Sequence, residues 1–199
     1  MTRFGYVLAT LLAAEFFVVA FASVAWLEPH PRFLWNASAS APIGLYRLQP
    51  DDHPTVGELV AIIPPPDTAR VMAARNYLPK GVPLLKQVAA LPGQRVCRHG
   101  VRVSVGGKHV ANALIHDRFG RALPIWRGCR VVPAATLFLI NMPADSFDSR
   151  YFGPIAASGL VGRALPILTR DTPNGPLVWR GVRGAQITSP AKKEQLRCK

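Results

Sequence analysis

Residues 36–46 read NASASAPIGLY and follow shortly after the one long apolar run of the chain. The stretch is rich in small residues and ends in the turn-formers Pro42 and Gly44. Side chains at i and i+2 of an extended segment point the same way, so Ser38 and Ser40 are predicted to share one face. We interpret Ser40 as a candidate nucleophile and Ser38 as its helper. A plain linker behind a membrane anchor has the same composition.

The composition indicates a small β-rich protein. A chain of 199 residues suits one compact domain with an appendage, and no internal repeat is visible. Its 19 prolines and 16 glycines indicate many short elements joined by turns. We therefore predict a mainly β fold rather than a helical bundle.

The charge balance indicates an anionic partner. The formal net charge is +13, from 24 Lys and Arg against 11 Asp and Glu. The basic residues are spread along the chain and form no recognisable nucleic-acid recognition module. A membrane lipid surface is therefore favoured as partner, and nucleic acid is not. A DNA-binding protein is the alternative, which would require cytoplasmic placement and salt-sensitive binding.

Residues 4–27 form an apolar run with one charge, Glu15. A helix of this length spans about 36 Å, more than the roughly 30 Å hydrocarbon core, so residues 1–27 are predicted to be a transmembrane anchor. A cleaved signal peptide is the alternative, with Arg3 as its short basic region. A short N-terminus before a long domain predicts that the domain lies outside, in the periplasm of a Gram-negative cell.

The rest of the chain is predicted to be a domain over residues 28–187, followed by a polar, basic and disordered tail over 188–199. Asp67 is predicted to cap a helix over Thr68–Leu78. The pattern further predicts strands at 57–63, 82–91, 136–140 and 160–168, a hairpin turning at Gly106-Gly107, and an irregular loop over 113–130.

Lys86 is the one charged residue within the apolar strand predicted at 82–91. A lysine in this position either reaches water or is desolvated. Desolvation lowers the pKa of a lysine and can leave a neutral amine, which is what a lysine general base requires. Most lysines in strands are simply solvated, and that alternative stays open.

The three cysteines, Cys97, Cys129 and Cys198, have no CxxC spacing, which argues against a zinc site, and we predict no metal. In an exported domain, Cys97 and Cys129 would form a disulfide; two buried free thiols are the alternative. Cys198 is predicted to be unpaired. The histidines show no metal-binding or triad-like context.

Three stretches fit one mechanism: SASAPIGLY at 38–46, LLKQVAALPG at 84–93, and FDSRYFG at 147–153 with LVGRA at 160–164. In this order behind an N-terminal anchor, they resemble the type I signal peptidases, the serine–lysine membrane proteases. The S-x-S-x-P-x-G-x-Y form is most similar to their conjugal-transfer branch, the TraF-type pilin-maturation peptidases. The resemblance covers residues 5–168. The usual Gly-Asp-Asn before the last motif is Ile-Asn-Met at 140–142 here.

The resemblance implies a signal-peptidase-like antiparallel β-sheet or barrel as the catalytic peptidase domain, without a cofactor. Ser40 matches the family's nucleophile and Lys86 its general base. The Ser40 N–H and the Ser38 hydroxyl match the oxyanion hole. Ser146 and Asp148 match loop residues that position the lysine. Arg150 matches an arginine that pairs with an acid.

The implied activity is that of a serine endopeptidase in the bacterial inner membrane, with its catalytic domain in the periplasm. Its substrate would be a membrane-tethered prepilin or preprotein, and its partners would include conjugation or type IV secretion components. Members of the branch in which a peptide amine resolves the acyl-enzyme would cyclise the product. The alternatives are a general secretory signal peptidase and a non-catalytic membrane scaffold of a secretion apparatus, for which Ser40 and Lys86 would be dispensable.

Overall fold

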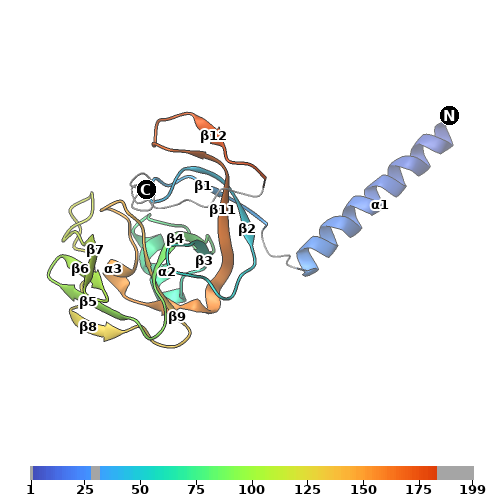
Figure 1. The fold of residues 1–199 in the computed structure, drawn as a ribbon. Helices are drawn as coiled ribbons and strands as arrows, with labels where there is room; N and C mark the ends of the chain where they lie inside the picture. Colours follow the sequence, from blue (N-terminus) through green and yellow to red (C-terminus); the bar gives the residue numbers. More distant parts are fainter. Residues whose placement is uncertain (1, 28–31, 183–199) are drawn as a thin grey trace, which may run out of the picture. The chain divides into compact units, whose positions relative to one another are not determined.

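The protein is described by a computed structural model over residues 2–27 and 32–182 (Figure 1). The chain divides into two compact units, Met1–Pro31 and Arg32–Lys199. The predicted tail at 188–199, with Cys198, lies outside the described residues.

The first unit is the helix α1 (Arg3–Leu27), one residue longer than the predicted apolar run. Its most apolar 18-residue window has a mean hydropathy of 2.3, and none of that window is buried. By length and composition this helix can cross a membrane, and a signal sequence would have the same properties.

The second unit is built on a curled antiparallel sheet of eight strands (Figure 1). The strand order is β1-β2-β11-β3-β4-β9-β10, and β12 pairs with β11. Register shifts within β4 and β11 mark bulges, which bend a sheet and increase its twist. The bounds are β1 (Phe33–Asn36), β2 (Gly44–Gln49), β3 (Leu59–Ile62), β4 (Leu84–Ala90), β9 (Thr136–Ile140), β10 (Ile155–Ala156), β11 (Leu160–Arg170) and β12 (Leu177–Trp179).

A second sheet of four strands has the order β7-β6-β5-β8. Its bounds are β5 (Arg95–His99), β6 (Arg102–Val105), β7 (Lys108–Asn112) and β8 (Gly128–Val131). The predicted hairpin is confirmed, because Gly106 and Gly107 join β6 to β7 with φ of 56° and 81°. The prediction of an irregular loop over 113–130 is wrong at its end, where β8 pairs with β5.

The helices of the second unit are short: α2 (Pro66–Ala74), α3 (Ser149–Phe152) and the 3-10 turn η1 (Ala157–Gly159). The predicted helix Thr68–Leu78 with Asp67 as its cap is wrong at both ends. Pro65 is the N-cap and Pro66 begins the helix, since a proline in the first turn lacks only an N–H that would be unpaired anyway. Asp67 instead pairs with Arg70, at 2.5 Å.

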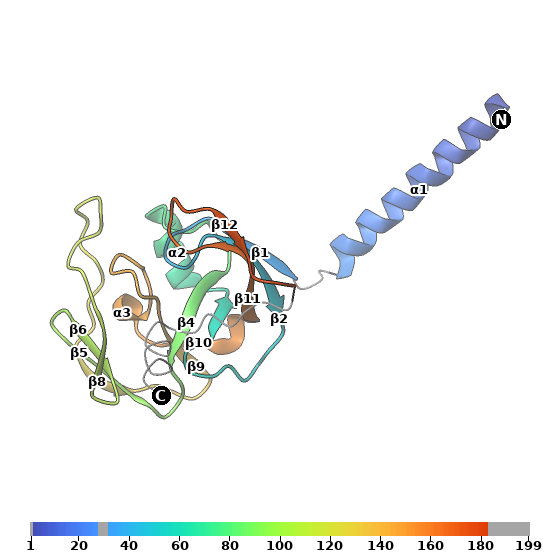
Figure 2. The ribbon, with the colours of Figure 1, turned by 45° about the horizontal axis from the view of Figure 1, so that its top comes forward.

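The two sheets are joined through α3, which Figure 2 places between the small sheet and β4. The buried Arg98 of β5 donates from Nη1 to the carbonyl oxygen of Arg150 in α3, at 2.5 Å. Trp126 donates from Nε1 to the carbonyl oxygen of Ser149, at 3.1 Å. From the large sheet, the Leu139 N–H of β9 donates to Ser149 Oγ at 2.9 Å, so the predicted motif FDSRYFG is held by both sheets.

Two glycines allow β2 and β11 to approach closely. Gly44 has a φ of 147°, and a Cβ there would lie 2.0 Å from the carbonyl oxygen of Leu168. Gly162 has a φ of 143°, and a Cβ there would lie 2.2 Å from the carbonyl oxygen of Gln49. No other residue type fits these positions, because both the backbone conformation and the space exclude a side chain.

Candidate active site

Residues 36–42 connect β1 to β2 and are called the nucleophile turn below. The predicted extended segment is wrong here, since residues 39–40 form a turn. The turn forms because the buried amide of Asn36 donates to the carbonyl oxygens of Ala41 and Pro42, which follow it in the chain, and so closes the loop. The predicted proximity nevertheless holds, because the Ser38 and Ser40 Oγ atoms lie 3.0 Å apart.

The spacing of Pro42, Gly44 and Tyr46 has a structural explanation. The Tyr46 hydroxyl donates to the carbonyl oxygen of Pro42 at 2.6 Å, across the base of the nucleophile turn. Burial raises the pKa of Tyr46, which keeps the phenol protonated as a donor. Gly44 allows β2 to pass close to β11, as described above. These residues hold the turn in place.

Lys86 is 3% exposed, on the face of β4 that carries the core residues Leu84 and Val88. Its partner across the ladder is Val60 of β3, which is fully buried. Burial among these apolar side chains lowers the pKa of Lys86 to about 8, against an opposing effect of the Asp148 carboxylate. About a tenth of the amine is therefore neutral at pH 7, far more than for a solvated lysine.

Ser146, Asp148 and Arg150 surround the lysine from the segment that follows β9, and with Lys86 they are called the lysine site below. Lys86 Nζ donates to Ser146 Oγ at 2.6 Å. Arg150 Nε lies 2.8 Å from Asp148 Oδ1, and both side chains are at most 1% exposed. Asp148 also caps α3 by accepting from the backbone N–H of Arg150 at 3.1 Å.

Asn141 supports the lysine site although sequence reasoning treated its surroundings only as a departure from the family motif. Its Oδ1 accepts from the backbone N–H of Gln87 at 3.0 Å, and its Nδ2 donates to the carbonyl oxygen of Leu85 at 2.9 Å. Asn141 thus binds the backbone on both sides of Lys86. Its own N–H donates to Asp148 at 3.1 Å. The sequence signal that could have indicated this role is an asparagine directly after the buried strand predicted at 136–140.

One cavity of about 620 Å³ joins the two regions. Ser38 and Ser40 line it from the nucleophile turn, and Lys86 and Ser146 line it from the lysine site. Most of the remaining lining is apolar, including Met72, Leu123 and Phe147. Asp148 and Arg150 do not line the cavity and act through the residues that do. Four of the predicted site residues therefore line one cavity.

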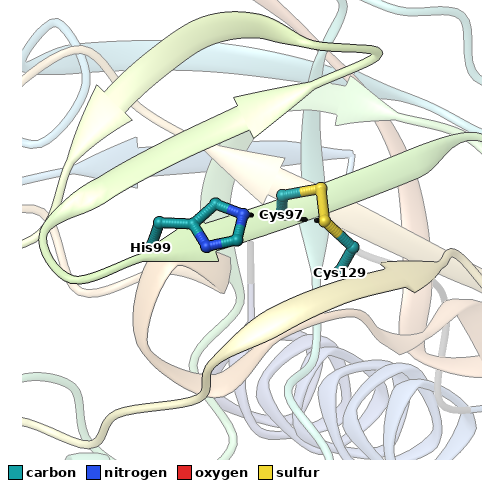
Figure 3. Close-up of side chains that lie close together, drawn as sticks. All are labelled: Cys97, His99 and Cys129. Atoms are coloured by element: carbon teal, nitrogen blue, oxygen red, sulfur yellow. Dashed lines mark hydrogen bonds between the residues drawn. A yellow bond between two sulfur atoms is a disulfide. The ribbon is translucent and has the colours of Figure 1, made fainter.

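Cys97 and Cys129 lie away from this cavity, directly opposite each other on β5 and β8. The structure joins them in a disulfide, with His99 beside it (Figure 3). His99 Nε2 lies 3.7 Å from Cys129 Sγ. The three side chains are close enough to share a metal ion, but the two sulfur atoms are bonded to each other instead.

Comparison with known proteins matches residues 3–168 to the family described as signal peptidase, peptidase S26. A conjugal transfer protein TraF from Agrobacterium fabrum is 41% identical over 146 residues, 68% of this chain and 82% of that protein. A probable TraF from Sinorhizobium fredii is 41% identical, over 67% of this chain and 76% of that protein. The chain belongs to the signal peptidase family, peptidase S26, and is a TraF-type member of it.

More distant similarities are also found. A plasmid transfer protein TraF from Escherichia coli is 31% identical over 67% of this chain and 81% of that protein. The crystal structure of a signal peptidase I from Enterococcus faecalis aligns with a TM-score of 0.33 and 17% identity, over 56% of this chain and 96% of that one.

Proposed function

We propose that this protein is a membrane-anchored serine endopeptidase with Ser40 as nucleophile and Lys86 as general base. One observation carries the proposal: a buried lysine with its pKa lowered to about 8 lines the same cavity as a serine hydroxyl. The substrates are signal- or propeptide-like segments of exported proteins, such as a conjugative pilin precursor. The names of the related proteins support a role in conjugal transfer.

The chemistry balances with the residues present. Neutral Lys86 takes the proton of the Ser40 hydroxyl as Oγ attacks the peptide carbonyl carbon. The Ser40 N–H and the Ser38 hydroxyl stabilise the oxyanion, and loss of one such donor typically costs about 2.7–4 kcal/mol in the barrier. Charged Lys86 then protonates the leaving amine, and the acyl chain stays on Ser40. Lys86 next activates a water, which releases the acid, or a peptide amine, which gives a cyclic product.

The placement of the enzyme follows from its anchor. With α1 retained in the bacterial inner membrane, the catalytic domain is periplasmic and meets substrates that are themselves tethered to the bilayer. The Cys97–Cys129 disulfide supports an oxidising compartment. Membrane lipid, the prepilin or preprotein, and components of a conjugation or type IV secretion apparatus are the proposed partners. A general secretory signal peptidase would share this placement and differ in its substrates.

The test is processing of a pilin-type precursor with an Ala-x-Ala-like site, by the full chain in detergent. Ser40→Ala and Lys86→Ala are each expected to abolish cleavage while the protein stays folded. Ser158→Ala and Lys108→Ala, at exposed positions, serve as matched controls and should cleave normally. Full cleavage by either active-site variant would favour the non-catalytic scaffold. Mass spectrometry separates the products, because a cyclic one is lighter by one water.

The pH dependence gives a second readout of the same proposal. Only the neutral Lys86 amine accepts a proton, and its pKa is about 8. The rate of cleavage should therefore rise about tenfold per pH unit below that value and level off above it. A rate that is flat between pH 6 and 9 would exclude Lys86 as the base.

A further inference from the structure

Asn36 makes more side-chain hydrogen bonds than either serine it supports. Its two Nδ2 hydrogens are shared among three carbonyl oxygens, those of Ser38, Ala41 and Pro42, at 2.9, 3.1 and 3.1 Å. Its Oδ1 accepts from the Ser38 N–H and from the Ser38 hydroxyl, each at 3.1 Å. Asn36 as a whole residue is 8% exposed. Turning the amide over would set its oxygen against three carbonyl oxygens, so the contacts fix its orientation.

This orientation decides which serine donates to the other. An amide oxygen carries no hydrogen, so Ser38 must be the donor in its contact with Asn36 Oδ1. A hydroxyl has a single hydrogen, and that of Ser38 is therefore already used. The 3.0 Å contact between the two hydroxyls can be a hydrogen bond at the same time only if Ser40 donates and Ser38 accepts.

We propose that Asn36 is a positioning residue that sets the direction of both serine hydroxyl hydrogens. In the resting site, the hydrogen of Ser40 points to Ser38 rather than to Lys86. Among the described residues, Ser38 is the one side chain to which the Ser40 hydroxyl is hydrogen-bonded. This inference rests on the proposed function, in which Ser38 donates to the oxyanion and Ser40 gives its proton to Lys86.

Two hydrogens must therefore turn when a substrate carbonyl enters. The Ser38 hydrogen leaves Asn36 Oδ1 for the developing oxyanion, and the Ser40 hydrogen leaves Ser38 for the Lys86 nitrogen. Asn36 keeps its bond to the Ser38 N–H and its three bonds to carbonyl oxygens during this change, so the backbone stays in place. A donor already fixed near the oxyanion costs little reorganisation at the moment of reaction. The resting site thus holds its nucleophile unactivated until a carbonyl competes for the Ser38 hydrogen.

A double-mutant cycle separates this role from simple support of the turn. Cleavage is measured for the full chain in detergent with the wild type, Asn36→Ala, Ser38→Ala and the double variant. Asn36→Ala is expected to lower kcat about tenfold with KM within about twofold, since it loosens one oxyanion donor without touching the substrate. In the Ser38→Ala background the same change should lower kcat by less than about threefold, because there is no hydroxyl left to position.

Asn36→Ser keeps the cycle informative if Asn36→Ala does not fold. Its hydroxyl can donate to a carbonyl oxygen of the turn, but its shorter side chain leaves the Ser38 hydroxyl without the Asn36 Oδ1 acceptor. Its kcat should therefore fall about tenfold, and by less than about threefold in the Ser38→Ala background. Equal factors in both backgrounds would overturn the inference and leave Asn36 as a support of the turn. An inactive wild type would instead count against the proposed peptidase.

Discussion

The nucleophile turn and the lysine site face one cavity but are held in opposite ways. Asn36 holds the turn through bonds to residues only two to six positions away, and Ser38 at its tip is exposed. Lys86 is bonded to Ser146, 60 positions away, and its strand is bound by Asn141 across 54 and 56 positions. The nucleophile turn is held by local contacts and is open to solvent, whereas the lysine site is assembled from distant segments and is buried.

The difference follows from what each group must do. In the proposed mechanism a substrate backbone has to reach the Ser40 hydroxyl, so the support of Ser40 cannot come from side chains packed over it. A lysine must lose contact with water before its pKa falls toward neutrality, so it has to lie within the core. Burial of an ionisable group lowers the free energy of unfolding. We therefore expect changes in the lysine site to alter stability strongly, and changes in the nucleophile turn to alter mainly the rate.

Asp148→Ala should give the largest change in stability. It leaves the Arg150 guanidinium buried without its carboxylate, which typically costs about 3–5 kcal/mol. The matched control is Asp67→Ala, in a pair with Arg70 whose side chains are 87% and 70% exposed. That change should stay within about 0.5 kcal/mol. Urea unfolding of the full chain in detergent measures the stability of both variants. Similar losses in the two would contradict the predicted difference between the buried and the exposed ion pair.

Lys86→Met should raise stability at pH 7 while abolishing cleavage. A pKa lowered from 10.5 to about 8 corresponds to a cost of about 3 kcal/mol for burying the charged amine, which Met removes. Loss of the hydrogen bond to Ser146 offsets about 1 kcal/mol of this gain. The net gain is therefore about 2 kcal/mol.

The stability gained by Lys86→Met depends on pH. Below pH 8 the amine is charged in both states, and the folded state bears the full penalty of burying it. Between about pH 8 and 10.5 the unfolded chain binds more protons, so wild-type stability rises with pH relative to Lys86→Met. Urea unfolding at pH 7 and pH 10 measures the difference. An equal gain at both values would contradict the burial argument, and Lys108→Met, at an exposed position, should show no gain.

Ser38→Ala should give the smallest change in stability, within about 0.5 kcal/mol, because its side chain is exposed in a turn. The same variant should lower kcat about 100-fold through the loss of an oxyanion donor. Thermal unfolding and cleavage rates on one preparation measure the two effects together. A large loss of stability would mean that the turn depends on the Ser38 hydroxyl as well as on Asn36.

The amino-acid sequence alone was enough to predict those features that depend on neighbouring residues. The apolar run predicted α1, Gly106-Gly107 predicted a hairpin, and the strand Thr136–Ile140 was predicted at its observed bounds. The three motifs predicted four residues that line one cavity. Periodicity, turn chemistry and short motifs are encoded over a few positions, so a linear reading recovers them.

Tertiary structure decided what depends on residues far apart. The sequence left both a solvated and a desolvated position open for Lys86, the solvated one being commoner for strand lysines. Its burial beside Val60 of a neighbouring strand shows that it is desolvated. The backbone amide of Asn141 completes the contacts of Asp148, and its side chain binds the strand of Lys86 across 54 residues. Even the nucleophile turn was predicted as extended, because the bonds of Asn36 to three carbonyl oxygens leave no periodic signal. Desolvation and hydrogen-bond closure are properties of the packed chain, and only its three-dimensional arrangement determines them.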